Sequence, residues 1–218
     1  MKRLLWLLLA ASMACVPAAN KRSGSSKSKD LYPDFASLTA AREAGSDFRV
    51  LFEDRRSSVA VFAIHGGNIE PGTSQAALAV AGGDWSYYLF ECLGTFEECR
   101  SFHVTSARYD DPAAVALAAS SLLGVSLHGS RDTEPFVCVG GANAGLRASM
   151  AASLLEAGIQ VEEPCKRLPG AAPKNIVNRA REGGVQLEIS VPLCRKLEAD
   201  EGFRREFGAA VRRGMKTP

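Results

Sequence analysis

The stretch VAVFAIHGGNIE, residues 59–70, constrains this chain more than any other. A run of apolar and β-branched residues ends abruptly at His65, two glycines follow, and Glu70 comes next. A short apolar run bounded by glycine is typical of a strand buried on both faces of an α/β sheet. Ligands of such sheets bind beyond the carboxyl ends of the strands. The sequence therefore predicts that His65 and Glu70 lie where functional residues are found.

The rest of the chain alternates between strand and helix patterns. Strands are predicted at residues 48–52, 58–64, 85–91, 101–105, 124–127, 135–139 and 185–190. Helices are predicted at residues 35–44, 73–81, 111–123, 143–157, 192–198 and 202–213, and residues 162–184 are predicted to be largely loop. This order favours an α/β fold: one domain of three layers, with a mixed, mostly parallel sheet and helices on both faces.

The N-terminus differs from the rest of the chain. Lys2 and Arg3 precede a short apolar run and then small residues, which is typical of a secretory signal peptide, here residues 1–19. The run is too short to span a bilayer, so no transmembrane span is expected. Residues 20–30 are polar and Ser-rich and are expected to be a flexible linker before a domain at 31–218. We expect a secreted or periplasmic protein, with a lipid anchor at Cys15 as the alternative.

Charge and cysteine content narrow the class of protein. Hydrophobic residues make up 46% of the 218 positions, as in ordinary globular proteins, and a net charge of +2 gives no electrostatic reason to expect a nucleic-acid partner. In an oxidising compartment, Cys92 is expected to pair with Cys99 and Cys165 with Cys194. Cys138 lies in an apolar strand and is expected to be a buried small hydrophobe. Other pairings remain open.

Two of the three histidines share one context. His65 and His128 each follow an apolar strand and precede a glycine. Strands of one sheet that end in this way would bring two imidazoles to the same rim, and Glu70 follows His65 closely enough to return a carboxylate to the same point. A His-Glu-His set with an open fourth position is a pattern of hydrolytic zinc sites, in which the metal lowers the pKa of a bound water.

A zinc hydrolase also needs a general base and a cationic group. Glu188 lies in the apolar strand VQLEIS, where a charged side chain is costly unless it faces a site or solvent. The alternative, at least as well supported by periodicity, is an edge strand whose polar face carries Gln186, Glu188 and Ser190. Arg179 is suited to binding a carboxylate in a bidentate manner, or it is simply a surface arginine.

Four segments together resemble the bacteriophage-type poly-γ-glutamate hydrolases, zinc enzymes with a fold related to the zinc carboxypeptidases. They are HGGNIEPGTSQAALAVAGGDWSYYLFE, FHVTSARYDDP, VSLHGS and NIVNRAREGGVQLEIS, within residues 59–195. The resemblance implies one Zn²⁺ ion held by His65, Glu70 and His128, and a catalytic carboxylate at Glu188. It also implies that Asn178 and Arg179 contact a substrate carboxylate. His103 matches a family histidine and is a rival ligand, a neighbour of the ligands, a substrate contact or a buried structural residue.

The expected reaction follows from this resemblance. Zn²⁺ would polarise the scissile carbonyl and its water, Glu188 would transfer the proton to the leaving amine, and Arg179 would stabilise the oxyanion or anchor a carboxylate. The expected substrate is an anionic γ-glutamyl polymer or peptide, and the expected state is a monomer. Two alternatives remain: a zinc amidase or carboxypeptidase that acts on cell-wall peptides, and a non-catalytic secreted binding protein of the same fold.

Overall fold

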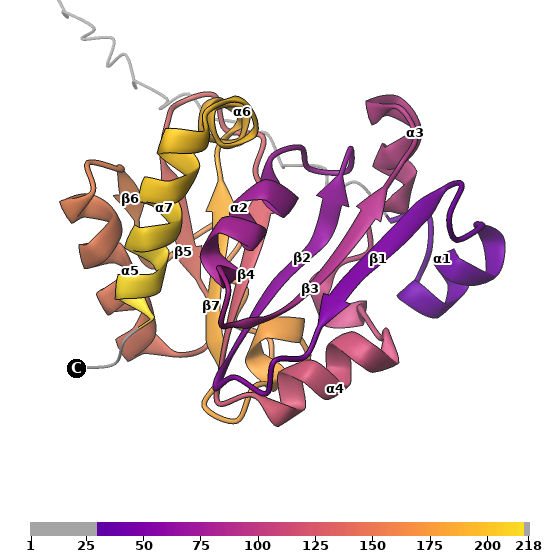
Figure 1. Ribbon diagram of the computed structural model, residues 1–218, viewed down its shortest axis with the longest axis horizontal. Coiled ribbons are helices and arrows are strands. Elements are labelled where there is room, and N and C mark those ends of the chain that lie inside the picture. Colours follow the sequence, from indigo (N-terminus) through magenta and orange to yellow (C-terminus); the bar gives the residue numbers. More distant parts are fainter. Residues whose placement is uncertain (1–29, 216–218) are drawn as a thin grey trace, which may run out of the picture.

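The computed structural model describes residues 30–215, which form a seven-stranded mixed sheet (Figure 1). The strand order is β1-β3-β2-β4-β7-β5-β6. Neighbours run parallel throughout β3-β2-β4-β7 and between β5 and β6, whereas β1 and β5 run antiparallel to β3 and β7. The predicted α/β fold with a mixed, mostly parallel sheet is confirmed. The strands are β1 (Phe48–Glu53), β2 (Val59–Gly67), β3 (Ser86–Cys92), β4 (Leu123–Gly129), β5 (Val137–Gly140), β6 (Val161–Glu162) and β7 (Gly184–Ile189).

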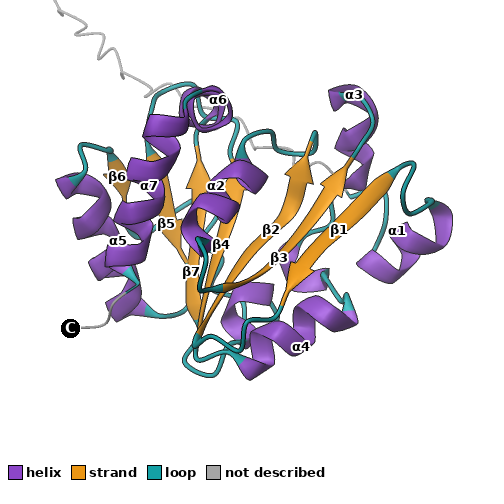
Figure 2. Ribbon diagram, in the orientation of Figure 1, coloured by secondary structure: helices purple, strands orange, loops and turns teal. Residues whose placement is uncertain are grey.

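Helices cover both faces of the sheet, and each face has its own hydrophobic cluster (Figure 2). One face packs against α2 (Thr73–Ala81), α5 (Ala144–Glu156), α6 (Val191–Ala199) and α7 (Glu201–Gly214). The other face packs against α1 (Phe35–Ala41), α4 (Pro112–Ser120) and the 3₁₀ helix η3 (Ile176–Arg179). The connection from β3 to α4 contains α3 (Phe96–Cys99), η1 (Arg100–Phe102) and η2 (Ser106–Arg108).

Local sequence explains the central elements. The side chains of β2, β4 and β7 are buried along almost their whole length, which requires the apolar runs seen in the sequence. Helix α4 begins where Asp111 accepts hydrogen bonds from the backbone N–H groups of residues 113 and 114, with Pro112 at its first position. Helix α5 begins in the same way at Asn143, which accepts from the N–H of residue 146. These elements place the ends of β2, β4 and β7 at one rim.

The structure differs most clearly from the sequence prediction at three places. The strand predicted at residues 101–105 is wrong: the chain there forms η1 and an irregular segment that carries His103. No strand position is free beside β3, because β1 and β2 already flank it, and the Cys92–Cys99 disulfide turns the chain back. The helix predicted to reach Leu123 ends at Ser120, and Leu123 already belongs to β4. Strand β2 continues through His65 to Gly67 instead of ending before the histidine.

The predicted signal peptide and almost all of the predicted linker lie outside the described residues. Asp30 was expected to be the last linker residue, but its carboxylate accepts hydrogen bonds from Thr105 and Arg108 and contacts His103. It therefore belongs to the folded domain. Across residues 30–215, no helix is both long and apolar enough to cross a membrane.

One predicted disulfide is confirmed and the other is wrong. Cys92 is bonded to Cys99, as predicted. Cys165 is bonded to Cys138, not to Cys194, which has no disulfide partner among the described cysteines. The two cysteines that pair lie on the same side of the sheet: Cys138 is the register partner of Glu188 and lies under the loop that carries Cys165. Cys194 lies on the opposite side, in α6 and the hydrophobic cluster of that face. Cys138 is thus a structural half-cystine and not a free buried hydrophobe.

Candidate metal centre and active site

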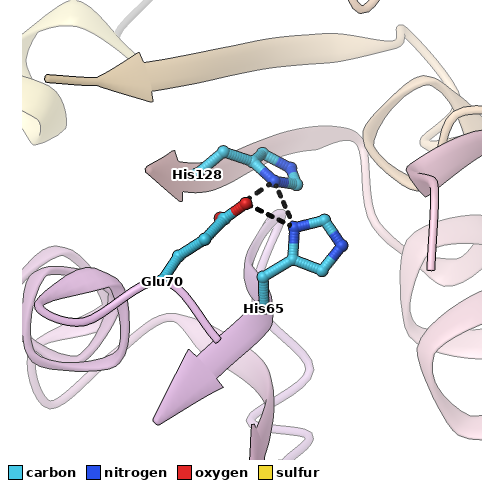
Figure 3. A group of neighbouring side chains, drawn as sticks. All are labelled: His65, Glu70 and His128. Carbon is cyan, nitrogen blue, oxygen red and sulfur yellow. Dashed lines mark hydrogen bonds and ion pairs between the residues drawn. The ribbon is translucent and has the colours of Figure 1, made fainter. Parts of the chain in front are cut away.

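Side chains of His65, Glu70 and His128 converge at the ends of β2 and β4 (Figure 3). His65 Nδ1 lies 3.1 Å from Glu70 Oε1 and 3.0 Å from His128 Nδ1. His128 Nδ1 lies 3.6 Å from Glu70 Oε2. Both imidazoles are almost completely buried. The structure therefore brings together the three side chains that the sequence predicted to share one ion.

The loop after β2 returns Glu70 to His65. The N–H of Glu70 donates to the carbonyl of His65 at 2.9 Å, and Thr73 Oγ1 donates to the carbonyl of Glu70 at 2.7 Å. The pairing of β2 with β3 shifts by one residue between Ala63 and Gly66, a bulge of the kind that redirects side chains next to active sites. A Cβ on Gly66 would lie 2.2 Å from Ser74 Oγ, so the packing requires glycine there.

Little room is left for a side chain after His128. The backbone N–H of Gly129 donates to Glu70 Oε2 at 2.8 Å, and a Cβ on Gly129 would lie 3.1 Å from Glu70 Cβ. The strand-His-Gly pattern thus has a physical basis at both strands: the glycine lets a second chain segment approach the histidine. Although burial opposes ionisation of Glu70, the imidazoles of His65 and His128 hold the pKa of this carboxyl below its usual range.

The outer nitrogens of both rings face protein oxygens. His65 Nε2 lies 2.9 Å from the carbonyl oxygen of Val104 and can only donate to it. His128 Nε2 lies 3.4 Å from Ser106 Oγ. A neutral His65 therefore has its lone pair on Nδ1, directed at Glu70 and at the second imidazole. Such backbone contacts fix the tautomer of metal-binding histidines in known sites.

These donors fit a zinc ion. Ligand distances of about 2.0–2.1 Å in a tetrahedral site imply ligand–ligand separations of roughly 3.3 Å. The three measured separations, 3.0, 3.1 and 3.6 Å, scatter about that value. Two imidazole nitrogens and a carboxylate are also an established zinc donor set, as in catalytic sites that leave the fourth position for water or substrate. The residues present are therefore compatible with the zinc site that the sequence predicts.

Glu188 lies on the strand beside His128. Strand β7 pairs with β4 on one side and β5 on the other, and His128 is the register partner of Glu188, so both side chains leave the same face of the sheet. The alternative interpretation of Glu188 as part of an exposed edge strand is wrong, because β7 is interior and buried throughout. Burial and the nearby Glu70 carboxylate raise the pKa of Glu188 well above its usual range.

Two amide side chains hold Glu188 in place. Gln186 Nε2 donates to Glu188 Oε1 at 2.7 Å, and Asn175 Nδ2 donates to Gln186 Oε1 at 2.7 Å. From the sequence, Gln186 is expected only on the polar face of a strand, and no role is expected for Asn175. The alternation of Gln186 with Glu188 was the available signal, but the approach of Asn175 depends on a loop whose path the sequence does not indicate.

His103 packs on His65 and lies outside the converging set. Its ring centroid lies 4.1 Å from that of His65, and its Nδ1 lies 2.7 Å from Asp30 Oδ1. The His103 side chain is 37% exposed to solvent, so it is not a fully buried structural residue. The neighbouring His65 and burial lower the pKa of His103. The contact with Asp30 joins positions 73 residues apart, and no local pattern in the sequence indicates it.

The Asn178-Arg179 pair lies away from the three converging side chains. Asn178 Oδ1 accepts from the N–H of Ala142, and its Nδ2 donates to the carbonyls of residues 170 and 172. It braces the loop, and the substrate contact expected for it stays a prediction. Arg179 donates from Nε to the carbonyl of Lys174. Arg179, Lys174 and Arg108 line an open groove of about 580 Å³ that also includes Pro33, Asp34, Ala107 and Asp110.

Comparison with known proteins identifies relatives over most of the chain. Residues 32–206 match the family model of poly-gamma-glutamate hydrolase. YndL of Bacillus subtilis (strain 168) is 32% identical over 175 residues, which cover 78% of this chain and 67% of YndL. The SPbeta prophage-derived protein YoqZ of the same organism is 33% identical over 171 residues, covering 77% of this chain. The chain spans 61% of the length of YoqZ.

Solved structures share the fold. A bacteriophage poly-gamma-glutamate hydrolase superposes with a TM-score of 0.77 at 30% identity, covering 85% of this chain and 96% of the phage protein. A zinc-free apo structure of YndL superposes with a TM-score of 0.78 at 29% identity, covering 86% of this chain and 98% of that one. Similarity therefore extends over nearly the whole described domain.

Proposed function

The chain belongs to the poly-gamma-glutamate hydrolase family, and from this premise we propose that it is a zinc-dependent hydrolase that cleaves γ-glutamyl amide bonds of poly-γ-glutamate. The observation that carries the proposal is the convergence of His65, Glu70 and His128 beside the buried carboxyl of Glu188. A metal-binding triad and a separate proton-accepting group are the two parts that metal-assisted amide hydrolysis requires.

Zinc is the metal that we propose for the triad. Its ligands would be Nδ1 of His65, Nδ1 of His128 and a carboxylate oxygen of Glu70. When bound there, zinc would act as a Lewis acid on the scissile carbonyl and lower the pKa of a water in the open position. The relative YndL supports this choice, because its structure is described as a zinc-free apo form, which implies that a zinc-bound form exists.

The remaining steps belong to the residues of the chain. Glu188, with Oε1 held by Gln186, is positioned to accept a proton from the attacking water and to deliver it to the leaving amine. Its raised pKa suits that task, because a carboxylate of ordinary acidity is a weak base at neutral pH. The carbonyl of Val104 keeps the His65 ring in one orientation while the reaction proceeds.

The charge around the cleft supports an anionic polymer as substrate. A γ-linked glutamate polymer keeps one free carboxylate on every residue, so a site for it needs cationic groups. The groove beside the Ser106 segment carries Arg108, Lys174 and Arg179 together with the acidic Asp34 and Asp110. Arg108 is paired with Asp30, so Lys174 and Arg179 are the cations of the groove with no acidic partner among the described residues. Arg179 is thus proposed as an anchor for a substrate carboxylate, in the groove and not at the ligands.

A location outside the cytosol is also part of the proposal. Two disulfides, Cys92–Cys99 and Cys138–Cys165, are typical of proteins that fold in an oxidising compartment. A secreted or periplasmic protein would meet extracellular polymer there. Non-reducing electrophoresis and cell fractionation of the full chain, expressed in a bacterium, would test this location.

The main test measures metal and products on the same sample. Purified protein should contain close to one zinc per chain, and incubation with poly-γ-glutamate should shorten the polymer in size-exclusion profiles. A chelator should abolish the shortening and added zinc should restore it. Peptidoglycan fragments serve as the competing substrate. Chelator-resistant hydrolysis would reject the zinc mechanism, and cleavage of peptidoglycan without cleavage of the polymer would reject the substrate.

A further inference from the structure

The loop of residues 163–175 covers the polar face of β7 beside Glu188. The Cys138–Cys165 disulfide ties it to β5 at the register partner of Glu188. Two backbone bonds continue the attachment: the N–H of Cys165 donates to the carbonyl of residue 139, and the N–H of Gly141 donates to the carbonyl of Pro169. This loop is therefore held fixed beside Glu188 and forms one wall of the candidate site.

Arg167 lies between these two attachments and projects a cation from that wall. Its Nη2 donates to Asp132 Oδ2, and Asp132 also accepts from Ser130 Oγ at 2.7 Å. The N–H of Ser130 in turn donates to the carbonyl of Ile189, the residue after Glu188. A short chain of contacts thus connects the guanidinium to both β4 and β7, the two strands that carry His128 and Glu188. The charge of Arg167 also lowers the pKa of Glu188, against the larger effect of burial.

The guanidinium of Arg167 has free donors for a ligand. An arginine offers five N–H donors, and among the described residues only Asp132 accepts from this one. Its side chain is 57% exposed, so a ligand can reach it, and an ion pair this exposed contributes little by itself. Arg147 offers a contrast: it is 18% exposed and is bonded to Glu163 and the carbonyl of Gly141. Arg147 is thus held by two protein partners, whereas Arg167 has one and keeps most of its donors free for a ligand.

We propose that Arg167 binds the free α-carboxylate of the γ-linked glutamate next to the scissile amide, and so selects substrates that carry this carboxylate. The inference rests on the proposed function. In a γ-linked residue the α-carboxylate stands at a fixed short distance from the amide, and a planar guanidinium recognises a carboxylate by two parallel hydrogen bonds. Asp132 keeps the guanidinium oriented before the substrate arrives.

The test compares two oligomers and two arginines. A short γ-linked glutamate oligomer and the same oligomer with its α-carboxylates converted to carboxamides are bound to the Glu188→Gln variant, with and without Arg167→Gln. Losing a charge-assisted pair should weaken binding of the carboxylate oligomer about tenfold or more and leave the carboxamide oligomer almost unchanged. Arg167→Lys should recover part of the affinity. Arg205, an exposed arginine paired with Glu201 on α7, is the matched control, and Arg205→Gln should change neither.

Kinetics on the otherwise unmodified, zinc-loaded protein complete the test. Arg167→Gln should raise KM for the carboxylate substrate more than it lowers kcat. Equal losses for both oligomers would mean that Arg167 only supports the loop, and no loss for either would remove it from the site; both results overturn the inference. If the protein binds the oligomer through Arg167 yet never hydrolyses it, the proposed function fails while the inference stands.

Discussion

The candidate site has two walls that are held in different ways. The first wall is the rim of β2 and β4 with His65, Glu70 and His128, in which Glu70 returns to the strand five residues before it. The second wall is β7 with the loop of residues 163–175, which bears Glu188 and is fixed by the Cys138–Cys165 disulfide, a closure of 27 residues. The first wall is held by hydrogen bonds, among them one from the Gly129 N–H to Glu70 across 59 residues, whereas the second wall is held by a disulfide. The two functions, metal binding and proton transfer, should therefore be separable by mutation.

The largest expected effect separates them directly. Glu188→Gln keeps the shape of the side chain but removes the proton acceptor, so turnover should fall by roughly 10²–10⁴-fold while zinc content stays unchanged. His128→Ala should instead lose zinc, because it removes one of three protein ligands. Metal analysis and polymer cleavage on both variants check the prediction. Loss of zinc in Glu188→Gln would show that the second wall also holds the metal.

The two disulfides should affect opposite walls. The chain-entropy relation gives about 3.5 kcal/mol for the longer Cys138–Cys165 closure and about 2.4 kcal/mol for the Cys92–Cys99 closure of 7 residues. The Cys138→Ala/Cys165→Ala variant should thus lose more unfolding free energy in urea and lose turnover, with zinc affinity kept.

Cys92→Ala/Cys99→Ala is the matched variant for the first wall. The carbonyl of Cys92 accepts from the N–H of Asn68, within the loop that leads to Glu70. Removal of the Cys92–Cys99 disulfide should loosen this loop, and should therefore weaken zinc affinity more than it lowers turnover at saturating zinc. If both double variants show the same pattern, the walls are not independent.

A smaller effect is expected from Gln186→Leu. The Gln186 amide donates to Glu188 and thereby lowers the pKa of that carboxyl, against the larger effect of burial. Removing the donor raises the pKa of Glu188 further. Since the ionised form accepts the proton, the acid limb of the pH–rate profile should move to higher pH, and turnover at neutral pH should fall roughly tenfold. An unmoved acid limb would assign that limb to another group.

The sequence predicts the first wall well because its signals are local. An apolar strand, a histidine and a glycine occur together at both His65 and His128. A side chain has no room at Gly66 and little room at Gly129. The second wall is predicted only at Glu188. The 163–175 loop crosses one face of the sheet, and this path decides both the pairing of Cys138 with Cys165 and the position of Arg167. The sequence of the loop has no periodicity from which the path could be predicted.

Asp30 shows the same limit from the other end of the chain. The residues before Asp30 are polar and predict a linker, yet the Asp30 carboxylate contacts His103, which lies 73 residues away in the sequence. Six of the seven strands, in contrast, follow from apolar runs that the sequence shows directly, and only the two-residue strand β6 is not predicted. The strand expected at 101–105 failed because strand formation needs a free partner as well as a suitable run, and β3 has none to offer.

The smallest expected effect concerns Cys194, which lies where the two walls meet. Its Sγ donates to the carbonyl of Ile189 at 3.4 Å, and its backbone packs against Gly72, close to Glu70. Burial, with the Glu70 and Glu188 carboxylates, raises the pKa of this thiol to about 12, so at neutral pH the reactive thiolate is almost absent.

Iodoacetamide should therefore leave Cys194 unmodified in the native protein and label it only after unfolding, as read by mass spectrometry of the peptide that contains it. The same labelling experiment on the Cys138→Ala/Cys165→Ala variant tests whether the loop and β7 open separately. If loosening the 163–175 loop leaves β7 in place, Cys194 should stay protected there too. Rapid labelling would mean that the loop and the end of β7 open together, and the second wall would then extend from the loop to α6 as one cooperative unit.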